Sequence, residues 1–456
     1  MINSYPLEIN EENEKVLYYP KELNFSRIHT VTFGSLSIPC KTRAQKTKKK
    51  KITLSRALAN AFHIPNIPLK FHLFEKEGTL FIGPIVGIFT AGFTSYPDNP
   101  IGNRSYSLSR LFANYEQLGV LPIVFGIQHI NWEHGIVSGF IYTNNHWKQI
   151  DLPLPNVIYD RLPNRTVENL AQIKKLKRKL QDEYAIPWFN PRFFNKMEVY
   201  QKLVKESSIK TYLPKTVQFS DDTLLKEMLD EFGYIYLKPD KGSAGAGIFQ
   251  IKQTDEGIFV RFRDEDSQNR LIKFTHNTTL YRFLQEKISE PYIIQQGIQL
   301  IRFNQQFADF RIHTNKNPEG KWVATVLACK LSGKGSPTTH VMAGGEVKTL
   351  DEIFINDEER KDYTKKLVRA VILLSEQLEK KMDGIIAEIG FDIGIDEDGK
   401  IWMFEANAKP GRSIFKHPHL LKYEKLINKY VMLFAVELTN AVIQTPEKMF
   451  TDLIMQ

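Results

Sequence analysis

The sequence predicts an α/β (α+β) protein with several sheets, and three stretches carry this prediction. Residues 236–251 have the pattern of a strand, a glycine-rich loop and a second strand. Residues 385–407 have the pattern of a hairpin whose apolar strands carry acidic and amide side chains. Residues 83–125 alternate between buried strand, helix and buried strand, which is typical of a parallel βαβ unit.

The composition indicates an ordinary water-soluble protein. The chain has 456 residues, of which 42% are hydrophobic and 25% charged, which is enough for about two or three domains. Its two cysteines, Cys40 and Cys329, lie far apart in the sequence, so a reducing compartment is favoured over a disulfide or a zinc site. We find no signal peptide and no apolar stretch of membrane-spanning length, and we therefore expect a cytoplasmic protein.

The net charge of +9 is partly local, because a lysine run at 46–51 contributes much of it. This run lacks the interleaved aromatic residues of a nucleic-acid site. We interpret it as a solvated loop, so nucleic acid is not an expected partner.

Residues 1–92 are predicted to form a small β-rich accessory module. Residues 31–38 alternate as a strand does, and residues 54–62 have helical spacing. Two further apolar runs flank the turn residues 75–78, which indicates a hairpin. This module contains no group of residues that suggests catalysis.

The character of the chain changes near residue 83, and we assign residues 93–195 to an α/β domain. Buried strands are predicted at 83–90, 121–125 and 156–160. The dinucleotide fingerprint GxGxxG is absent, which disfavours a dinucleotide site. Between the first two strands, a helix that ends at a glycine is predicted from the spacing of Leu108, Leu111, Tyr115, Leu118 and Gly119.

Residues 196–445 are predicted to form the domain that carries the functional site. Asn195 followed by Glu198 resembles a capping box and places Lys196 in the first turn of a helix. From this stretch alone, a surface lysine is the preferred interpretation of Lys196.

A loop at 241–247 follows a strand that contains Lys238. Glycines let backbone amides approach an anion closely, and the lysine adds a point charge for phosphate. The loop leads into a strand and lacks the Gly-Lys-Ser/Thr sequence, so it is not a Walker A motif. By itself the pattern is a weak signal, since glycine-rich hairpins are common.

Further along, Asp309 and Arg311 share one face of a predicted strand. Two interpretations stay open, a cross-strand ion pair and a role in a site. The next strand carries Lys330, and the loop at 332–345 is rich in glycine and hydroxyl residues. We expect this loop to be mobile and to lie on the substrate side.

In the last predicted hairpin, Glu405 and Asn407 are two residues apart and point to one face. If Ile395 pairs with Lys400, then Asp392 lies on that same face. Half-buried carboxylates require a metal ion or an ion pair. We favour a metal, because oxygen donors of this kind are the ligands of magnesium.

Together these motifs resemble the ATP-grasp superfamily, and more closely the YheC/YheD family of endospore coat-associated proteins. The general resemblance covers about residues 120–440. It rests on Lys196, the Lys238–Ile248 loop, Asp309-Phe-Arg311, Asp392 and Glu405-Ala-Asn407. The closer resemblance adds Gly83-Pro-x-x-Gly-Ile88 and Gln295-Gln-Gly-Ile298. It implies an ATP-grasp fold with a small lobe at about 196–295 and a large lobe at about 296–445, preceded by the βαβ domain and the β-rich module.

The resemblance also implies a role for each site residue. The phosphates of ATP would be held by Lys196, Lys238 and the loop residues Lys241, Gly242, Ser243, Ala244, Gly245 and Gly247. The hinge that binds adenine would be Gln295, Gln296, Gly297 and Ile298, with backbone pairing at Gln296 and Ile298. Two magnesium ions would be held by Asp392, Glu405 and Asn407. The γ-phosphate and an acyl-phosphate would be steadied by Arg311, Lys330 and Arg412.

The implied activity is an ATP- and Mg²⁺-dependent carboxylate–amine ligase that acts through an acyl-phosphate, with a spore-coat or cell-surface peptide or protein as a candidate substrate. Two alternatives stay open: a kinase on the same fold, and a coat structural protein without turnover. The family also implies association with the spore coat. An acidic partner is suggested by Arg104, Arg161, Arg165 and Lys334. Gln295-Gln296 stands where many relatives carry a glutamate, and Lys330 stands where arginine is commoner.

Overall fold

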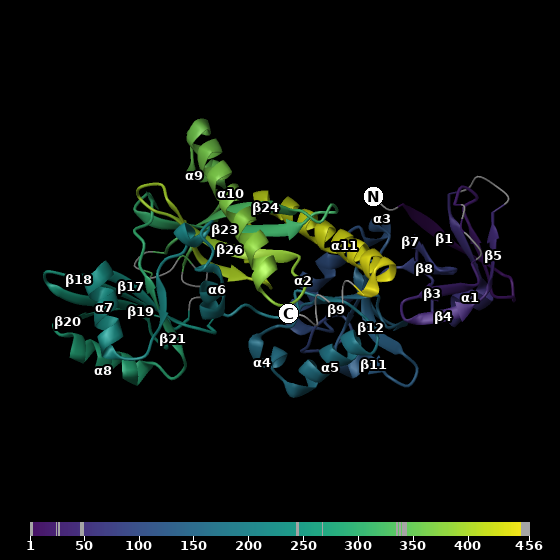
Figure 1. The fold of residues 1–456 in the computed structure, drawn as a ribbon, viewed down its shortest axis with the longest axis horizontal. Helices are drawn as coiled ribbons and strands as arrows, with labels where there is room; N and C mark the ends of the chain where they lie inside the picture. Colours follow the sequence, from purple (N-terminus) through teal and green to yellow (C-terminus); the bar gives the residue numbers. More distant parts are fainter. Residues whose placement is uncertain are drawn as a thin grey trace.

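The computed structural model describes residues 3–23, 25, 28–45, 50–242, 246–266, 268–333, 336, 339 and 344–447. Most of the lysine run, Ser243–Gly245 of the glycine loop and part of the loop at 332–345 lie outside the described residues. The molecule is elongated, with the N-terminal sheet at one end and the sheet covered by α7 (Asp222–Phe232) and α8 (Asn277–Lys287) at the other (Figure 1).

The N-terminal sheet has the strand order β4-β3-β8-β7-β1-β6-β2-β5, which confirms the predicted β-rich module. The single strand predicted at 31–38 is wrong, because Gly34 turns the chain with a φ of +58° and two strands pair there. The elements are β1 (Ser4–Asn10), β2 (Val16–Tyr19), β3 (Thr30–Phe33), β4 (Leu36–Pro39), β5 (Lys41–Ala44), β6 (Ile52–Ser55), α1 (Arg56–Ala61), β7 (Lys70–Lys76) and β8 (Thr79–Gly83).

The second sheet has the order β11-β12-β10-β9-β14-β15, with β13 paired to β12. Its elements are β9 (Ile85–Phe89), α2 (Ser105–Ser109), α3 (Tyr115–Leu118), β10 (Leu121–Phe125), β11 (Ile130–Asn131), β12 (Ile136–Thr143), β13 (His146–Pro153), β14 (Val157–Asp160), α4 (Arg165–Glu168), α5 (Ala171–Asp182) and β15 (Trp188–Phe189). Strand β9 is parallel to both β10 and β14, which confirms the βαβ unit. Since β9 belongs to this sheet, the sheet begins before residue 93.

The continuous helix predicted across residues 108–118 is wrong. Helices α2 and α3 are separate, because Asn114 adopts a left-handed conformation with a φ of 62°. Gly119 ends α3 in the left-handed conformation, as its position predicted. The apolar spacing therefore identified the buried side chains correctly but not the break between the helices.

The third sheet has the order β16-β21-β17-β18-β19-β20. Helices α7 and α8 cover one of its faces and leave the other open. Its strands are β16 (Thr216–Gln218), β17 (Tyr234–Pro239), β18 (Phe249–Thr254), β19 (Gly257–Arg263), β20 (Asn269–Phe274) and β21 (Tyr292–Gln296).

The fourth sheet has the order β25-β24-β23-β26-β27, with β22 paired to β23. Helices α6 and α10 pack together against this sheet. Its elements are α6 (Lys196–Leu203), β22 (Arg302–Phe303), β23 (Gln306–Lys316), β24 (Trp322–Leu331), β25 (Glu346–Lys348), α9 (Leu350–Ile353), α10 (Asp357–Lys381), β26 (Glu388–Ile395) and β27 (Ile401–Asn407).

The last helix, α11 (Leu421–Gln444), contacts β23 and β24 of the fourth sheet and β14 and β7 of the first two (Figure 1). With the turn before it, the segment Pro418–Gln444 is long and apolar enough to cross a membrane, and our sequence analysis overlooked it. The side chains of its inner face, including Val431 and Ala435, are buried in the core that it shares with these sheets, and 44% of the apolar window is buried. This is the ordinary position of a core helix.

The register of the β26–β27 hairpin differs from the predicted one. Ile395 pairs with Ile401 rather than with Lys400, and an irregularity next to Asp392 adds a residue on β27. As a result Asp392 lies directly opposite Glu405, two residues beyond Met403, which it would face if Ile395 paired with Lys400. Because the difference is even, Asp392 keeps the predicted face.

Candidate active site

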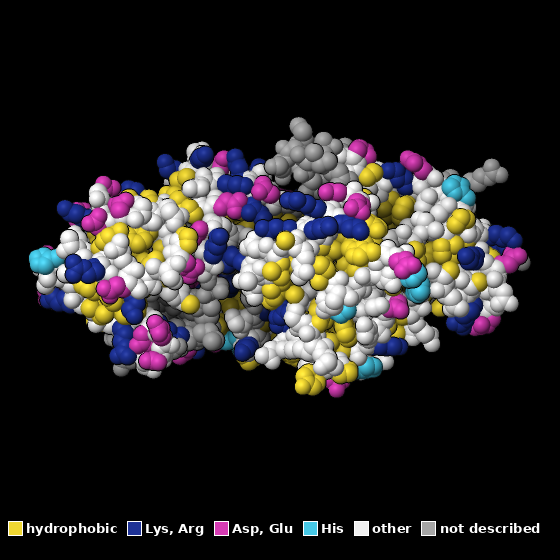
Figure 2. Space-filling model, turned by 90° about the horizontal axis from the view of Figure 1, so that it is seen from below, with side chains coloured by type: hydrophobic (Ala, Val, Ile, Leu, Met, Phe, Trp, Pro, Cys, Tyr) yellow, Lys and Arg dark blue, Asp and Glu magenta, His cyan; other side chains and the backbone are white. Residues whose placement is uncertain are grey.

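A cleft of about 610 Å³ lies between the third sheet, the fourth sheet and the loop that follows β14. In Figure 2 the surface recedes between the lobe that carries α7 and α8, at the left, and the centre of the molecule. Twelve of the predicted site residues line this cleft: Lys196, Lys238, Lys241, Gly242, Gln295, Gln296, Ile298, Arg311, Lys330, Asp392, Glu405 and Asn407. The cleft thus gathers residues that are far apart in the sequence.

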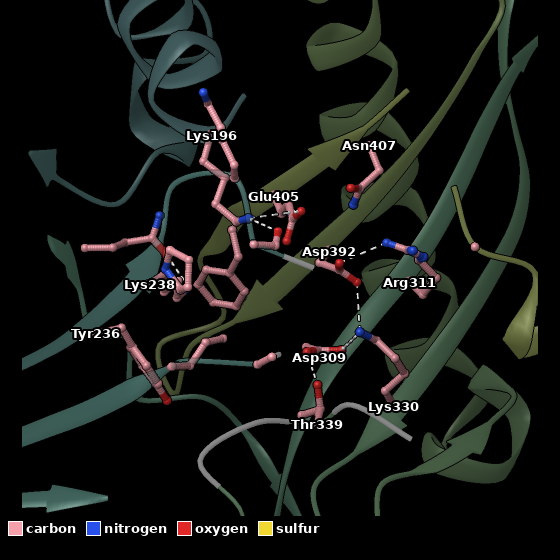
Figure 3. Close-up of a pocket in the computed structure, with 18 of the residues that line it drawn as sticks. Lys196, Tyr236, Lys238, Asp309, Arg311, Lys330, Thr339, Asp392, Glu405 and Asn407 are labelled. Carbon is pink, nitrogen blue, oxygen red and sulfur yellow. Dashed lines mark hydrogen bonds and ion pairs between the residues drawn. The ribbon is translucent and has the colours of Figure 1, made fainter. Parts of the chain in front are cut away.

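On the wall formed by the fourth sheet, alternating charges form a chain of ion pairs (Figure 3). Arg311 Nη1 lies 2.9 Å from Asp392 Oδ2, and Lys330 Nζ lies 2.8 Å from Asp392 Oδ1. Lys330 Nζ also lies 3.1 Å from Asp309 Oδ1. The two interpretations of the Asp309–Arg311 strand are therefore compatible, because the same residues form cross-strand pairs and line the cleft.

These pairs determine which groups carry charge. Burial lowers the pKa of Lys330, but the carboxylates of Asp309 and Asp392 outweigh burial, and the net shift is upward. Burial raises the pKa of Asp309, against the opposing effect of Lys330. Lys330 therefore remains a cation facing the cleft.

Two further lysines line the cleft, Lys238 on β17 of the third sheet and Lys196 at the start of α6, which packs against the fourth sheet. Lys196 Nζ donates to the Gly242 carbonyl at 2.7 Å and lies 3.6 Å from Glu405 Oε1. Its side chain is only 12% exposed, so the surface interpretation of this residue is wrong. Lys238 Nζ donates to Gln295 Oε1 at 2.6 Å, and burial lowers the pKa of Lys238 to about 8.

The structure describes the two ends of the glycine loop, up to Gly242 and from Ala246 onward. Gly247 has a φ of +69°, and a Cβ there would lie 2.6 Å from the Tyr292 hydroxyl and 3.0 Å from Pro239 Cγ. A larger residue is therefore excluded by the turn itself. Gly247 and Gly297 are not among the residues that line the cleft, whereas Lys241 and Gly242 are.

At the hinge, both glutamine side chains have protein partners. Gln295 Nε2 donates to Thr216 Oγ1 at 3.2 Å. Gln296 Oε1 accepts from the Lys215 amide at 3.2 Å, and the Gln296 amide donates to the Lys215 carbonyl at 2.8 Å. These bonds join β21 to β16 and to the residue before it. Ile298, just beyond β21, lines the cleft.

The structure places Arg412 beside the cleft rather than in its wall. Its Nη2 lies 2.9 Å from Oε1 of the fully buried Glu388, and the Tyr159 hydroxyl donates to Oε2 of the same carboxylate. Burial raises the pKa of Glu388, but Arg412, His313 and Arg161 together outweigh burial, and the pKa falls to about 2. The predicted contact between Arg412 and phosphate therefore has no support in this geometry.

Arg165 is a cleft residue whose role the sequence did not reveal. The sequence suggests only an acidic partner for Arg165, yet its Nη1 donates to the Lys241 carbonyl at 2.9 Å. Its Nη2 donates to the Phe194 carbonyl at 2.7 Å. Arg165 thus joins the loop after β14 to the start of the glycine loop, a contact that no local motif encodes.

The donor set of Asp392, Glu405 and Asn407 fits magnesium. Asp392 and Glu405 face each other across β26 and β27, and Asn407 lies on the same face of β27. Within the described residues, no group of three or more His, Cys, Asp or Glu side chains is arranged to hold a metal ion. Two carboxylates and an amide suit an ion that takes its remaining ligands from phosphate and water.

A glycine loop between two strands, two lysines above it, and a carboxylate–amide hairpin across the cleft define the ATP-grasp class of protein. The YheC/D-like ATP-grasp family model matches residues 185–438, and the chain belongs to this family. The chain is 39% identical to the endospore coat-associated protein YheD of Bacillus subtilis (strain 168), across 97% of this chain and 98% of that protein. It is 23% identical to YheC of the same organism, across 71% and 89%.

A similar solved structure is the D-alanine–D-alanine ligase from Coxiella burnetii. The two chains share 12% sequence identity and a TM-score of 0.44. The similarity covers 82% of this chain and 100% of the ligase.

Proposed function

We propose that this protein is an ATP- and Mg²⁺-dependent ligase that joins a carboxylate to an amine through an acyl-phosphate. The observation that carries the proposal is the opposition of charges across one cleft. Lys238 lies on the third-sheet side. Asp392, flanked by Arg311 and Lys330, lies on the fourth-sheet side, where Lys196 approaches Glu405. A structural protein that made no use of this site would have no need to hold so many charges in a cleft.

In the proposed complex, Lys196 and Lys238 bind the α- and β-phosphates, and the glycine loop covers the triphosphate. Adenine lies against the hinge at Gln296 and Ile298. Magnesium, held by Asp392, Glu405 and Asn407, supplies neutralisation of the phosphate charge. We propose that these residues hold two magnesium ions.

The chemistry requires cations where Arg311 and Lys330 lie. The substrate carboxylate oxygen attacks the γ-phosphorus, the bond to the β-phosphate oxygen breaks, and ADP leaves. The amine nitrogen then attacks the acyl carbon, inorganic phosphate leaves, and the amine loses a proton. Arg311 and Lys330 stabilise the negative charge that develops on the transferred group.

The acyl-phosphate must be protected from water. The loop at 163–166 forms a third wall of the cleft, and Arg165 fastens it to the glycine loop. We propose that this wall and the residues Ser336 and Thr339, which also line the cleft, enclose the acceptor.

The names of the two relatives place those proteins with the endospore coat. We propose that this protein likewise associates with the coat and that its substrate is a peptide or protein there. Coat association accounts for an accessory N-terminal sheet that contributes no residue to the described cleft wall.

Thermal unfolding with and without Mg-ATP tests the nucleotide site first. A rise in melting temperature is expected, because a ligand that binds only the folded state stabilises it. Phosphate release is then measured against a panel of carboxylates and amines. Release that requires both substrates identifies a ligase, whereas phosphate retained on one product identifies a kinase. The absence of any shift at millimolar Mg-ATP would contradict the proposed nucleotide site.

The pKa of Lys238 predicts how affinity for Mg-ATP depends on pH. Only the cationic lysine attracts phosphate, and this pKa is lowered to about 8. We expect the affinity to fall as the pH rises from about 7 to about 9. Calorimetric titration across this range measures the effect, and Lys238→Gln should bind weakly with a flat pH profile. A wild-type profile as flat as that of the variant would remove Lys238 from the phosphate site.

A further inference from the structure

A second groove, of about 770 Å³, opens beside the proposed nucleotide cleft. Four residues belong to the walls of both: Tyr234, Phe307, Ser332 and Ser336. We call it the basic groove and define it by its three outer cations, Lys252, Arg261 and Arg302. None of the roles proposed above uses Lys252, Arg261 or Arg302.

The basic groove exists because the third sheet has helices on one face only. Along β18 and β19, Ile251 and Val260 point into the core beneath α7 and α8. The alternate residues Lys252 and Arg261 point to the opposite, helix-free face. Next to them Leu271 of β20 also lines the groove, and it is 58% exposed. The open face therefore combines cations with apolar surface.

The turn between β22 and β23 forms the other wall of the groove. Asn304 and Gln305 adopt left-handed conformations there, with φ values of 49° and 67°. Their side chains and that of Gln299 line the groove with amide groups. Amide groups can donate to and accept from the backbone of a polypeptide.

The charges of the groove are unbalanced. Within the described part of the chain, Lys252, Arg261 and Arg302 form no ion pair, and Glu397 is the only acidic residue among those that line the groove. In the proposed nucleotide cleft, by contrast, Arg311 and Lys330 are paired with carboxylates. Unpaired cations on a concave face attract a partner of negative charge.

The aromatic residues argue for a polypeptide rather than a nucleic acid. Arg302 lies over the ring of Phe307 at 4.3 Å, and Lys273 lies over the ring of Phe259 at 5.5 Å. Faces covered in this way are not free for the base stacking that single-stranded nucleic acids require. Acidic side chains can instead pair with these cations, and apolar side chains can pack on Leu271.

We propose that the basic groove binds an acidic, partly apolar segment of a polypeptide substrate and so delivers a neighbouring group of that chain to the cleft. This inference rests on the proposed ligase function and specifies its substrate class. Because the groove and the cleft share wall residues, a bound segment lies next to the reaction site. Recognition away from the reacting group is a general means of selecting one protein among many.

Fluorescence anisotropy of a fluorescein-labelled peptide tests this proposal with the full-length chain. The probe alternates glutamate and leucine over about ten residues, which spans roughly 33 Å when extended. We expect saturable binding that weakens with salt, and a loss of about tenfold or more in the double variant Arg261→Glu and Arg302→Glu. The rise in melting temperature with Mg-ATP should persist in this variant, since neither residue lines the nucleotide cleft.

The matched control is Lys226→Glu with Arg282→Glu, which makes the same change in net charge on the exposed surfaces of α7 and α8. This control should bind the peptide as the wild type does. Equal losses in both double variants would overturn the proposal, because only net charge would then matter. Tighter binding of an oligonucleotide of matched charge at the same site would also overturn it. If the peptide binds but Mg-ATP does not raise the melting temperature, the peptide-binding role of the groove is supported and the ligase proposal is contradicted.

Discussion

Glu405→Gln is expected to abolish the Mg-ATP-dependent rise in melting temperature while leaving the nucleotide-free protein almost unchanged. In the free protein this carboxylate forms one ion pair within the described residues, at 3.6 Å from Lys196, and it also attracts Lys238. Because that ion pair is long and partly exposed, an amide of the same shape costs little. In the complex with Mg-ATP, the substitution removes a charged ligand of the metal ion. We expect at least a 100-fold loss of Mg-ATP affinity, equivalent to about 2.8 kcal/mol.

Asp392→Asn provides an informative contrast to that variant. Asp392 accepts from both Arg311 and Lys330, so its replacement leaves two cations with weaker partners and also lowers the stability of the free protein. Glu346→Gln, at an exposed position, is the control and should change neither property. Retention of the full Mg-ATP shift by Glu405→Gln would show that this residue is not a metal ligand.

Glu388→Gln is expected to lower the free energy of unfolding by about 3–5 kcal/mol, because it leaves buried Arg412 without a counter-charge. Glu388 is fully buried, and Arg161 approaches it at 3.9 Å in addition to Arg412. Denaturant titration monitored by fluorescence measures the loss. Glu14→Gln removes an exposed pair with Lys41 and should leave the free energy of unfolding almost unchanged.

The same residue predicts a pH dependence of stability. The pKa of Glu388 is lowered to about 2 in the folded protein, from an ordinary value of 4.5. Its contribution is therefore present above about pH 4.5 and is lost as the pH falls toward 2. The stability difference between wild type and Glu388→Gln should shrink over this range.

Glu388→Gln also tests the position of Arg412. We expect the variant to keep its Mg-ATP shift at neutral pH, because neither Glu388 nor Arg412 lines the cleft. If the shift disappears while the variant remains folded, Arg412 contacts the nucleotide, as the sequence had predicted.

The sequence by itself determined what depends on local spacing. Two-residue periodicity put Glu405 and Asn407 on one strand face, and Asn195 began the helix that carries Lys196 by accepting from the Glu198 amide. The helix Asp357–Lys381 begins at Asn356, whose side chain accepts from the Glu358 and Glu359 amides, and ends with the basic residues Lys380 and Lys381. Such features depend on neighbours within a few residues, so they form in the same way however the distant parts of the chain pack.

The tertiary structure decided which charges meet. An irregular register set Asp392 opposite Glu405, and Arg165 reached a carbonyl of the glycine loop from another sheet. Arg412 pairs with Glu388, although the sequence does not distinguish it from a phosphate ligand. These outcomes depend on how separately formed sheets pack, because an ion pair requires two side chains within about 4 Å and no local pattern encodes the distance between elements far apart in the chain.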